Sequence, residues 1–321
     1  MTKLVVQIPC YNEEKTLSQT VSDIPRQIDG IDEVKILVID DGSTDRTVEV
    51  AKEIGVDYII KNTRNKGLAR TFHEGLVASL SLGADIIVNT DGDNQYKGQD
   101  IPKLIAPILK GESEIVIGDR ETDKIAHFSP LKKRMQKIGS LVVRMLSDTD
   151  VRDPVSGFRA FSREAAMRMN ILSPFSYTIE TVIQAGQKYI AINSVPIGTN
   201  PKTRESRLFQ SLPKFIERSL STMIRMYTMY QPLRVFFFIG CLCILAGLVP
   251  SIRFMIYYLM GQGDGHIQSL VLAAIFFIVG FQVLMIALVA DVISFNRRLI
   301  EETLMRVRHI EFDHLVKLDK K

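Results

Sequence analysis

Short apolar runs alternate with longer amphipathic stretches from residue 1 to about residue 205. The runs have the length of buried strands, and the stretches between them show the apolar spacing of helices. Alternation of this kind predicts βαβ units and a mostly parallel sheet covered by helices on both faces. The expected strands are 4–8, 34–39, 58–60, 86–88 and 115–117, and the expected helices are 14–28, 44–54, 69–82 and 100–109.

The C-terminal third has a different pattern. Residues 235–252 are apolar or small throughout, the apolar character resumes after Arg253, and 270–290 contain one amide, Gln282, and no charge. At ~1.5 Å per residue both stretches reach the ~30 Å needed to cross a bilayer. A buried hairpin of a soluble domain is the alternative, but neither stretch has a polar stripe to face water. We therefore expect a two-helix transmembrane hairpin.

Charges around this hairpin predict its orientation. The linker 261–266 holds no Lys or Arg, whereas arginines lie on the other flanks, at Arg225, Arg234, Arg297, Arg298, Arg306 and Arg308. By the positive-inside rule both termini are expected in the cytoplasm. The stretch 208–230 mixes apolar residues with Lys214, Arg218 and Arg225. It suits a helix in the membrane surface, and an ordinary core-facing helix fits nearly as well.

Amino-acid composition narrows the classes of protein to which the chain can belong. The 321 residues carry 40 Lys plus Arg against 36 Asp plus Glu, a net charge of +4 that gives no reason to expect a nucleic-acid partner. Cys10, Cys241 and Cys243 have the spacing of neither a disulfide framework nor a zinc site, which favours a reducing compartment. The N-terminal apolar run is too short for a signal peptide, so the first domain is expected in the cytoplasm.

Four polar clusters lie at or shortly after expected strand ends: "PCYNEE" at 9–14, "DDGSTD" at 40–45, "DGDNQY" at 91–96 and "DPVSGFR" at 153–159. Each alone is more simply a helix cap or turn; Ser43 and Asp45, for example, suit the start of a helix. In parallel sheets ligands bind at the carboxyl ends of the strands. Four clusters at one such edge therefore indicate a binding site.

The third cluster has the chemistry of a metal site. Asp91 and Asp93 flank a residue without a side chain and can turn toward one ligand, with the amide oxygen of Gln95 as a third donor. Oxygen donors suit Mg²⁺ or Mn²⁺ rather than zinc. Such a cation would bridge a diphosphate. The chain has neither a GxxxxGK[ST] loop nor a GxGxxG turn, so phosphates are not expected to be bound as in P-loop or dinucleotide-binding proteins.

In order and spacing, the motifs "PCYNEE", "DDGSTDRT", "NKG", "DGDNQY" and "DPVSGFR" resemble glycosyltransferase family 2 over roughly residues 3–207. With two C-terminal membrane helices, the chain resembles polyprenyl-phosphate glycosyltransferases of the dolichyl-phosphate mannose synthase or bacteriophage GtrB type. This implies a cytoplasmic GT-A domain at 1–207, juxtamembrane amphipathic helices at 208–233, a transmembrane hairpin at 234–292 and a cytoplasmic C-terminal helix at 293–321.

The resemblance also implies roles for individual residues. Asp91, Asp93 and Gln95 match the metal site, and Asp93, Arg120 and Asp153 are the expected catalytic residues, with Asp153 as orienter of the acceptor or the basic cluster. The expected nucleotide-sugar residues are Pro9, Tyr11, Glu13, Ile39, Asp41, Asp91, Gly92, Asp93 and Arg207. The expected acceptor-phosphate residues are Arg120, Lys133, Arg134 and Lys137.

Two positions depart from the family pattern. Lys137 stands where the dolichyl-phosphate synthases have a serine, and Pro201 stands where they have an arginine, six residues before Arg207. Lys202 or Arg204 could substitute for that arginine. The basic segment around them fits a loop over the diphosphate, and attraction to anionic lipid is the simpler alternative.

These features predict a membrane-anchored, inverting hexosyltransferase with a UDP- or GDP-hexose donor, a polyprenyl-phosphate acceptor and a Mg²⁺ or Mn²⁺ cofactor. A family 2 enzyme with a polysaccharide or glycolipid acceptor is the nearest alternative, although the chain lacks the tryptophan of the Gln-x-x-Arg-Trp motif. A catalytically silent, membrane-anchored nucleotide-sugar-binding protein is an alternative of another class. Paired membrane helices allow a homo-oligomer, but Gly240, Gly247 and Gly280 form no clear packing motif.

Overall fold

The structure is a computed structural model that describes residues 1–121, 130–173, 176–201, 212–262 and 265–319, without the side chains of 130–136, 212–215 and 316–319. The chain divides into two compact units. The first comprises Met1–Met223 and Leu304–Lys321, and the second is Ile224–Thr303. Each unit is described by itself.

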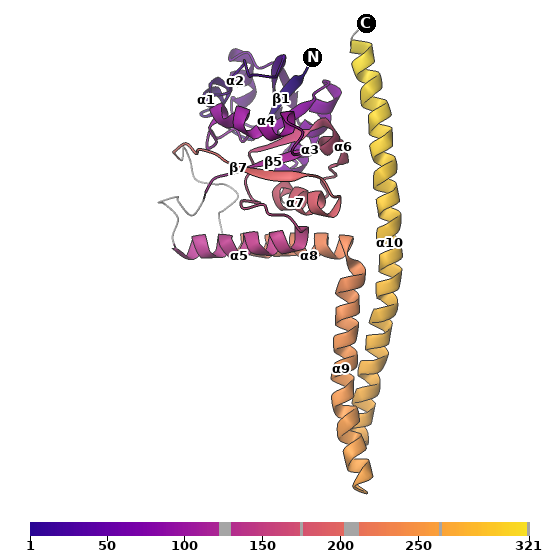
Figure 1. Cartoon of the computed structure of the whole chain (residues 1–321). Coiled ribbons are helices and arrows are strands. Elements are labelled where there is room, and N and C mark those ends of the chain that lie inside the picture. The colour runs from indigo at the N-terminus through magenta and orange to yellow at the C-terminus, as the bar shows by residue number, and fades with distance from the viewer. Residues whose placement is uncertain (122–129, 174–175, 202–211, 263–264, 320–321) are drawn as a thin grey trace. The chain divides into compact units, whose positions relative to one another are not determined.

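A sheet lies among the helices of the first unit (Figure 1). It has seven strands in the order β3-β2-β1-β4-β6-β5-β7. Neighbouring strands are parallel except at β6, which is antiparallel to both β4 and β5. The mostly parallel α/β sheet predicted from the sequence is confirmed. Its strands are β1 (Lys3–Cys10), β2 (Glu33–Asp40), β3 (Tyr58–Lys61), β4 (Ile86–Asn89), β5 (Ile115–Asp119), β6 (Arg159–Ser162) and β7 (Ile192–Pro196).

Helices cover both faces of this sheet because alternate side chains of each strand point to opposite sides. Val6 and Ile8 of β1 belong to a buried cluster with Leu104 of α4, whereas the Gln7 side chain between them reaches Phe72 of α3. The helices of this unit are α1 (Leu17–Ser22), α2 (Thr47–Glu53), α3 (Leu68–Ser81), α4 (Ile101–Leu109), α5 (Pro130–Ser147), α6 (Arg163–Arg168) and α7 (Tyr177–Gln187), with a short 3₁₀ turn η1 (Gly98–Asp100).

The "DPVSGFR" cluster corrects one expectation. It does not follow a strand but precedes β6, which begins at Arg159. Since β6 runs antiparallel to β4, with Asn89 opposite Arg159, its first residue lies level with the last residue of β4. The start of an antiparallel strand thus occupies the same edge as the carboxyl ends of the parallel strands, and all four clusters still meet there.

A segment near the C-terminus completes the first unit. Helix α10 runs without a break over Ile267–Asp319, so the expected boundary at residue 292 falls inside it. Arg308 donates hydrogen bonds to the carbonyls of Met167 (2.7 Å) and Met169 (3.1 Å) at the end of α6. Phe312 is 2% exposed. The end of α10 therefore packs on the domain formed by the first 223 residues.

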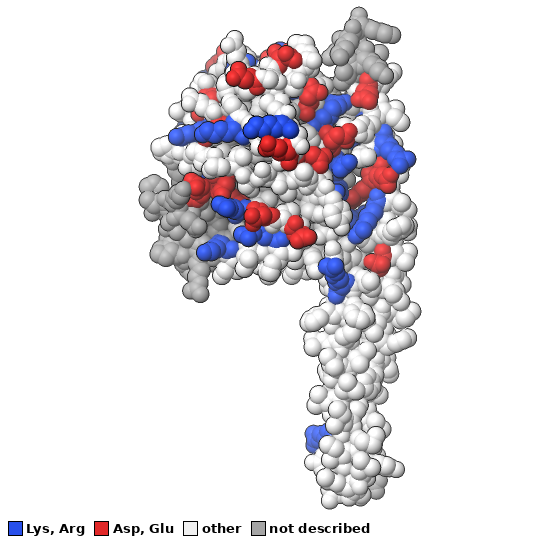
Figure 2. Space-filling model, viewed as in Figure 1, with Lys and Arg blue, Asp and Glu red and all other residues white. Residues whose placement is uncertain are grey.

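Helix α9 (Pro232–Leu259) and most of α10 form the second unit, and α8 (Leu212–Tyr230) leads into it. Both are long and apolar enough to cross a membrane by length and composition, and only 11% and 17% of their most apolar windows are buried. Figure 2 shows few charged side chains along α9 and the adjoining part of α10. Such exposure disfavours the alternative of a buried hairpin and suggests membrane anchoring.

The glycines of the hairpin let its two helices approach closely. A Cβ on Gly240 would lie 2.8 Å from the Leu284 side chain, and a Cβ on Gly280 would lie 3.1 Å from the Gly240 carbonyl oxygen. A side chain at either position would require the facing helix to shift. These glycines therefore serve packing within the hairpin.

Candidate active site

A cavity of about 360 Å³ opens at the sheet edge where the four clusters meet. Its wall is formed by the segments after β1, β2, β4 and β5, by the "NKG" turn and the start of α3, by the loop before β6, by the start of α7 and by Ser219 of α8. The cavity thus lies where ligands bind in parallel sheets. The residues predicted from the sequence that line it are Pro9, Tyr11, Glu13, Asp41, Asp91, Gly92, Asp93, Gln95 and Arg120.

The loop after β2 is held by the carboxylate of Asp41, which is 3% exposed. Its two oxygens accept hydrogen bonds from the backbone N–H groups of Lys66 (2.8 Å) and Gly67 (2.9 Å). Gly67 has φ +91°, a conformation that favours glycine. Asp41 therefore fixes the "NKG" turn beside the cavity as well as lining it.

The loop after β4 is fixed through the backbone of Gly92. The Gly92 carbonyl accepts hydrogen bonds from the hydroxyls of Thr16 (2.8 Å) and Thr20 (3.2 Å). A Cβ at Gly92 would lie 3.0 Å from Cys10 Sγ and 3.3 Å from Glu13 Cγ. A side chain between the two aspartates would thus be tightly placed against Cys10 and Glu13, and the turn is held by α1 and the residue before it.

Asp91 and Asp93 both lie on the cavity wall, and Asp93 is 9% exposed. Gln95 donates to Asp93 twice, from its backbone N–H to Oδ1 (3.2 Å) and from its side-chain nitrogen to Oδ2 (2.9 Å). It therefore turns its amide nitrogen, not its oxygen, toward Asp93. As a metal ligand Gln95 stays a prediction that requires this amide to rotate.

Across the described part of the chain, no three His, Cys, Asp or Glu side chains are grouped so that they could hold a metal ion. Two carboxylates on a wall of the cavity still fit a hard divalent cation, because Mg²⁺ and Mn²⁺ are commonly held by one or two carboxylates together with substrate phosphates and water. The donors present therefore fit a cation shared between protein and ligand.

Arg120 and Asp153 form a close ion pair at the cavity. Arg120 donates from Nε to Asp153 Oδ2 (2.7 Å) and from Nη2 to Oδ1 (3.0 Å). Asp153 is 2% exposed, while the Arg120 side chain is 20% exposed. Burial acts to lower the pKa of Arg120, but the neighbouring Tyr96 and Asp153 raise it above its ordinary value. Arg120 is thus a fixed positive charge, and Asp153 is the group that orients it.

Several predicted residues lie away from this wall or outside the description. Ile39 is buried in β2, and a Cβ on Gly75 of α3 would lie 2.9 Å from it. Lys137 is exposed on α5. The side chains of Lys133 and Arg134, and all of Arg207, lie outside the described residues, as do Lys202 and Arg204. The proposed roles of these residues stay predictions.

Two tyrosines on the wall are not among the predicted site residues. Tyr96 accepts a hydrogen bond from the Gly157 N–H (2.8 Å), and burial raises the pKa of Tyr96 to about 12. Tyr177 at the start of α7 stacks on Phe72, with ring centroids 3.8 Å apart. Tyr96 ends the "DGDNQY" cluster, which is a usable signal. Tyr177 follows no motif, so only the fold brings it to the cavity.

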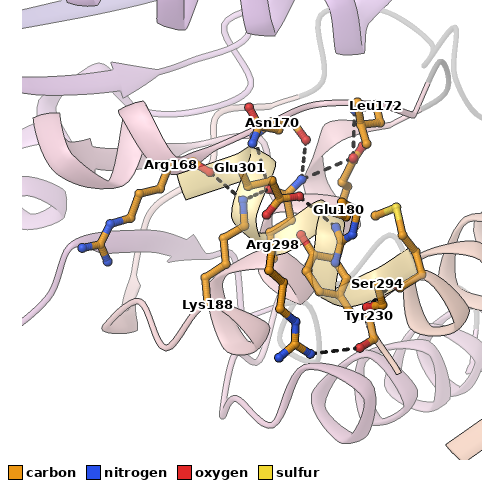
Figure 3. A network of polar contacts seen from close by, with 12 residues as sticks. Arg168, Asn170, Leu172, Glu180, Lys188, Tyr230, Ser294, Arg298 and Glu301 are labelled. Atoms are coloured by element: carbon orange, nitrogen blue, oxygen red, sulfur yellow. Dashed lines mark hydrogen bonds and ion pairs between the residues drawn. The ribbon is translucent and has the colours of Figure 1, made fainter. Parts of the chain in front are cut away.

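Helix α7, which brings Tyr177 to the cavity, is held by hydrogen bonds to residues 168–173, which precede it in the chain. Glu180, which is not exposed, accepts hydrogen bonds from the backbone N–H groups of Leu172 (2.8 Å) and Ser173 (2.9 Å). Lys188 donates to the carbonyl of Arg168 (2.7 Å), as Figure 3 shows. Burial raises the pKa of Glu180. Glu180 thus ties residues 172 and 173 to the first turn of α7, and Lys188 ties the end of α6 to the end of α7.

The first unit thus combines a seven-stranded, mostly parallel sheet with paired aspartates and an arginine at the edge where the cavity opens. A glycosyl transferase family 2 model matches residues 5–169, and the chain belongs to this family. It is a glycosyltransferase with a GT-A-like fold.

A solved structure has a similar fold. A glucosyl-3-phosphoglycerate synthase from Mycobacterium tuberculosis, solved with Mn²⁺ and UDP, superposes with a TM-score of 0.56 at 22% identity, over 71% of this chain and 80% of that one. This likeness shows the fold.

Curated relatives are similar in sequence. A UDP-N-acetylglucosamine–dolichyl-phosphate N-acetylglucosaminyltransferase from Methanococcus voltae is 33% identical over 60% of this chain and 83% of its own length. A dolichol-phosphate mannosyltransferase from Pyrococcus furiosus is 34% identical over 64% of this chain and 59% of its own length. An undecaprenyl-phosphate mannosyltransferase from Micrococcus luteus is 25% identical over 53% of this chain and 70% of its own length.

Proposed function

We propose that the chain transfers a hexose from a UDP- or GDP-sugar to a polyprenyl phosphate, undecaprenyl or dolichyl, at the cytoplasmic face of a membrane. The observation that carries the proposal is the combination of two features in one chain. A cavity at the sheet edge is lined by Asp91, Asp93 and Arg120, and two helices are long and apolar enough to span a bilayer. The relatives named for dolichyl and undecaprenyl phosphate acceptors support the choice of acceptor.

The donor diphosphate is placed by the acidic wall. Asp91 and Asp93 would hold Mg²⁺ or Mn²⁺, which neutralises charge on the diphosphate as it leaves. Gly92, without a side chain, lets the nucleotide approach the backbone of this turn. Pro9, Tyr11, Glu13 and Asp41 form the neighbouring wall for the nucleotide. The protein thus supplies a preformed site rather than a covalent intermediate.

The transfer is a direct displacement at the anomeric carbon with inversion. An oxygen of the polyprenyl phosphate forms the new bond while the bond to the nucleotide diphosphate breaks and carries its electron pair away. A phosphate monoester has a second pKa near ~6, so it is already largely ionised and needs no strong base. Arg120, fixed by Asp153, is positioned to stabilise charge on the phosphates. Lys133, Arg134, Lys137 and Arg207 are proposed as further phosphate contacts.

The test is a transfer assay with the purified full-length chain in detergent. Radiolabelled UDP- and GDP-sugars are screened with undecaprenyl or dolichyl phosphate, with and without a chelator, and the label in the lipid extract is counted. We expect label in the lipid phase with at least one donor and its loss with the chelator. Glu53→Gln, which removes an exposed carboxylate of α2, serves as a control that retains activity. Failure to label lipid with any donor and acceptor pair would overturn the proposal.

A further inference from the structure

Three polar side chains stand side by side across the central strands of the sheet. Gln7 of β1 is in register with Asn89 of β4, and Asn89 is in register with Arg159 of β6. All three are 0% exposed. Strands buried on both faces are normally apolar at such positions, and a buried polar group is costly unless it is hydrogen-bonded. We call these three residues the buried polar row.

Two members of the row, Gln7 and Asn89, are joined by a hydrogen bond, and their further hydrogen bonds lead toward the cavity. Gln7 Nε2 donates to Asn89 Oδ1 (2.9 Å) and to the carbonyl of Phe72 (3.3 Å). Asn89 Nδ2 donates to the carbonyl of Gly157 (2.8 Å) and to the Tyr177 hydroxyl (3.0 Å). Helix α3 leaves room for the Gln7 amide, because a Cβ on Gly75 would lie 2.5 Å from Gln7 Oε1. The chain thus accommodates this amide pair at a position where two apolar residues would pack more simply.

The peptide groups of Gly157 are held on both sides. Its N–H donates to the Tyr96 hydroxyl (2.8 Å), and its carbonyl accepts from Asn89 and, at 3.4 Å, from the Tyr177 hydroxyl. A Cβ on Gly157 would lie 3.0 Å from both carboxylate oxygens of Asp91. The Asp91 carboxylate therefore lies directly against the Gly157 backbone. A shift of that backbone would change the position of the Asp91 carboxylate.

Arg159, the third member of the row, fixes the loop that leads to Gly157. It donates to the carbonyls of Pro154 (2.7 Å), Ser156 (2.7 Å) and Thr178 (2.8 Å). Burial lowers the pKa of Arg159 to about 10, which still leaves it charged at neutral pH. The same loop carries Asp153, the partner of Arg120. Both ends of the loop are thus tied to the row.

We propose that Asn89 is a positioning residue of the transfer site, which sets the Asp91 carboxylate through the hydrogen bond of its side chain to Gly157. The inference rests on the proposed function only for the identity of the reaction. The competing explanation is that Asn89 contributes to stability alone. The two explanations predict different Mn²⁺-dependent nucleotide binding in a variant that regains stability. Asn89→Leu leaves the Gln7 amide without its partner, whereas Gln7→Leu/Asn89→Leu removes that unpaired amide as well and should regain part of the lost stability. In both variants the Gly157 carbonyl and the Tyr177 hydroxyl lose their hydrogen bonds to Asn89.

The experiment compares these two variants of the full-length chain with Ser79→Ala. Ser79 is a buried residue of α3 whose hydroxyl has no hydrogen-bond partner among the described residues, so it controls for loss of a buried polar atom. Thermal unfolding gives stability, calorimetry gives the binding of UDP and GDP with and without Mn²⁺, and hydrogen exchange of the metal-free protein reports on residues 153–158.

We expect Asn89→Leu to lower stability and to weaken Mn²⁺-dependent nucleotide binding by about 10-fold or more, the usual loss when a group that orients a metal ligand is removed. We also expect exchange at residues 153–158 to be faster in Asn89→Leu than in the unchanged protein. In the double variant we expect stability to recover in part, while Mn²⁺-dependent binding stays weak and exchange at residues 153–158 stays fast. Ser79→Ala should bind as the unchanged protein does.

The inference is overturned if binding recovers together with stability in the double variant, or if Asn89→Leu binds as the unchanged protein does. It is also overturned if the unchanged protein shows no Mn²⁺-dependent nucleotide binding. If that binding is present but no sugar reaches a lipid acceptor, the proposed function fails and the positioning role of Asn89 is still decided by the binding data.

Discussion

Two acidic loops at the same sheet edge, "DDGSTD" after β2 and "DGDNQY" after β4, use their carboxylates differently. In the first loop, Asp41 accepts two backbone N–H groups of the "NKG" turn, and Asp45 accepts the N–H of Thr47 at the start of α2. In the second loop, backbone contacts hold the Gly92 carbonyl, and Asp91 and Asp93 lie on the cavity wall. Both loops thus line the cavity, but Asp41 also fixes a turn from another part of the chain, whereas Asp93 accepts hydrogen bonds from Gln95 of its own loop.

The largest effect is expected for Asp93→Asn. If the second loop holds the cation, this change removes a charged oxygen ligand and with it several kcal/mol of charge stabilisation, which corresponds to about 100-fold or more in the rate of transfer. Thermal stability should change little. Steady-state transfer rates across a Mn²⁺ titration measure the effect, with Asp45→Asn as the matched carboxylate of the first loop. Full activity in Asp93→Asn would remove the distinction between the two loops.

A smaller effect on catalysis is expected for Asp153→Asn, since Asp153 touches Arg120 rather than the cavity contents. Loss of the buried partner should lower the free energy of unfolding by about 3 kcal/mol and, through misplacement of Arg120, reduce transfer by up to about 100-fold. The decisive measurement is a double-mutant cycle with Arg120→Gln. If Asp153 acts only through Arg120, its loss should cost little more in the Arg120→Gln background. A large additional loss there would indicate that Asp153 is itself a base.

The smallest effect on the chemical step is expected for Asp41→Asn. An amide oxygen can replace only part of the acceptor capacity of the carboxylate, so we expect a loss of about 1–2 kcal/mol in stability and a raised KM for the donor with nearly unchanged kcat. Denaturant unfolding and donor titrations measure the two quantities. A drop in kcat as large as that of Asp93→Asn would show that the first loop is part of the chemistry too.

Apolar patterning predicted the first five strands because each carries a short apolar run, which is buried in four of them, such as Leu37–Ile39 of β2, and partly buried in β3. The last two strands carry weaker signals. β6 is four residues long and begins with the buried Arg159, and β7 is only partly buried. A charged residue at the start of a strand gives no apolar signal, so β6 and the antiparallel entry to the site could not be predicted from periodicity.

The aspartates of the cavity could be predicted because their chemistry is visible in the motif itself. The buried polar row could not, because Gln7, Asn89 and Arg159 are far apart in sequence and become neighbours only through the strand order β1-β4-β6. The same holds for Tyr177, which reaches Asn89 from the start of α7. Motifs report which groups meet the ligand, while the groups that hold them in place depend on topology.

The packing of Arg308 and Phe312 on the first unit has a consequence for how the protein is made. The ribosome synthesises residues 1–223 first, then both apolar helices, and only last the segment from Leu304 onward that belongs to the first unit. Contacts between such distant parts of a chain form slowly. Arg308 can therefore donate to the carbonyls of Met167 and Met169 only after both hairpin helices have been synthesised. The catalytic domain therefore reaches its final state only after the segment from Leu304 onward has been synthesised.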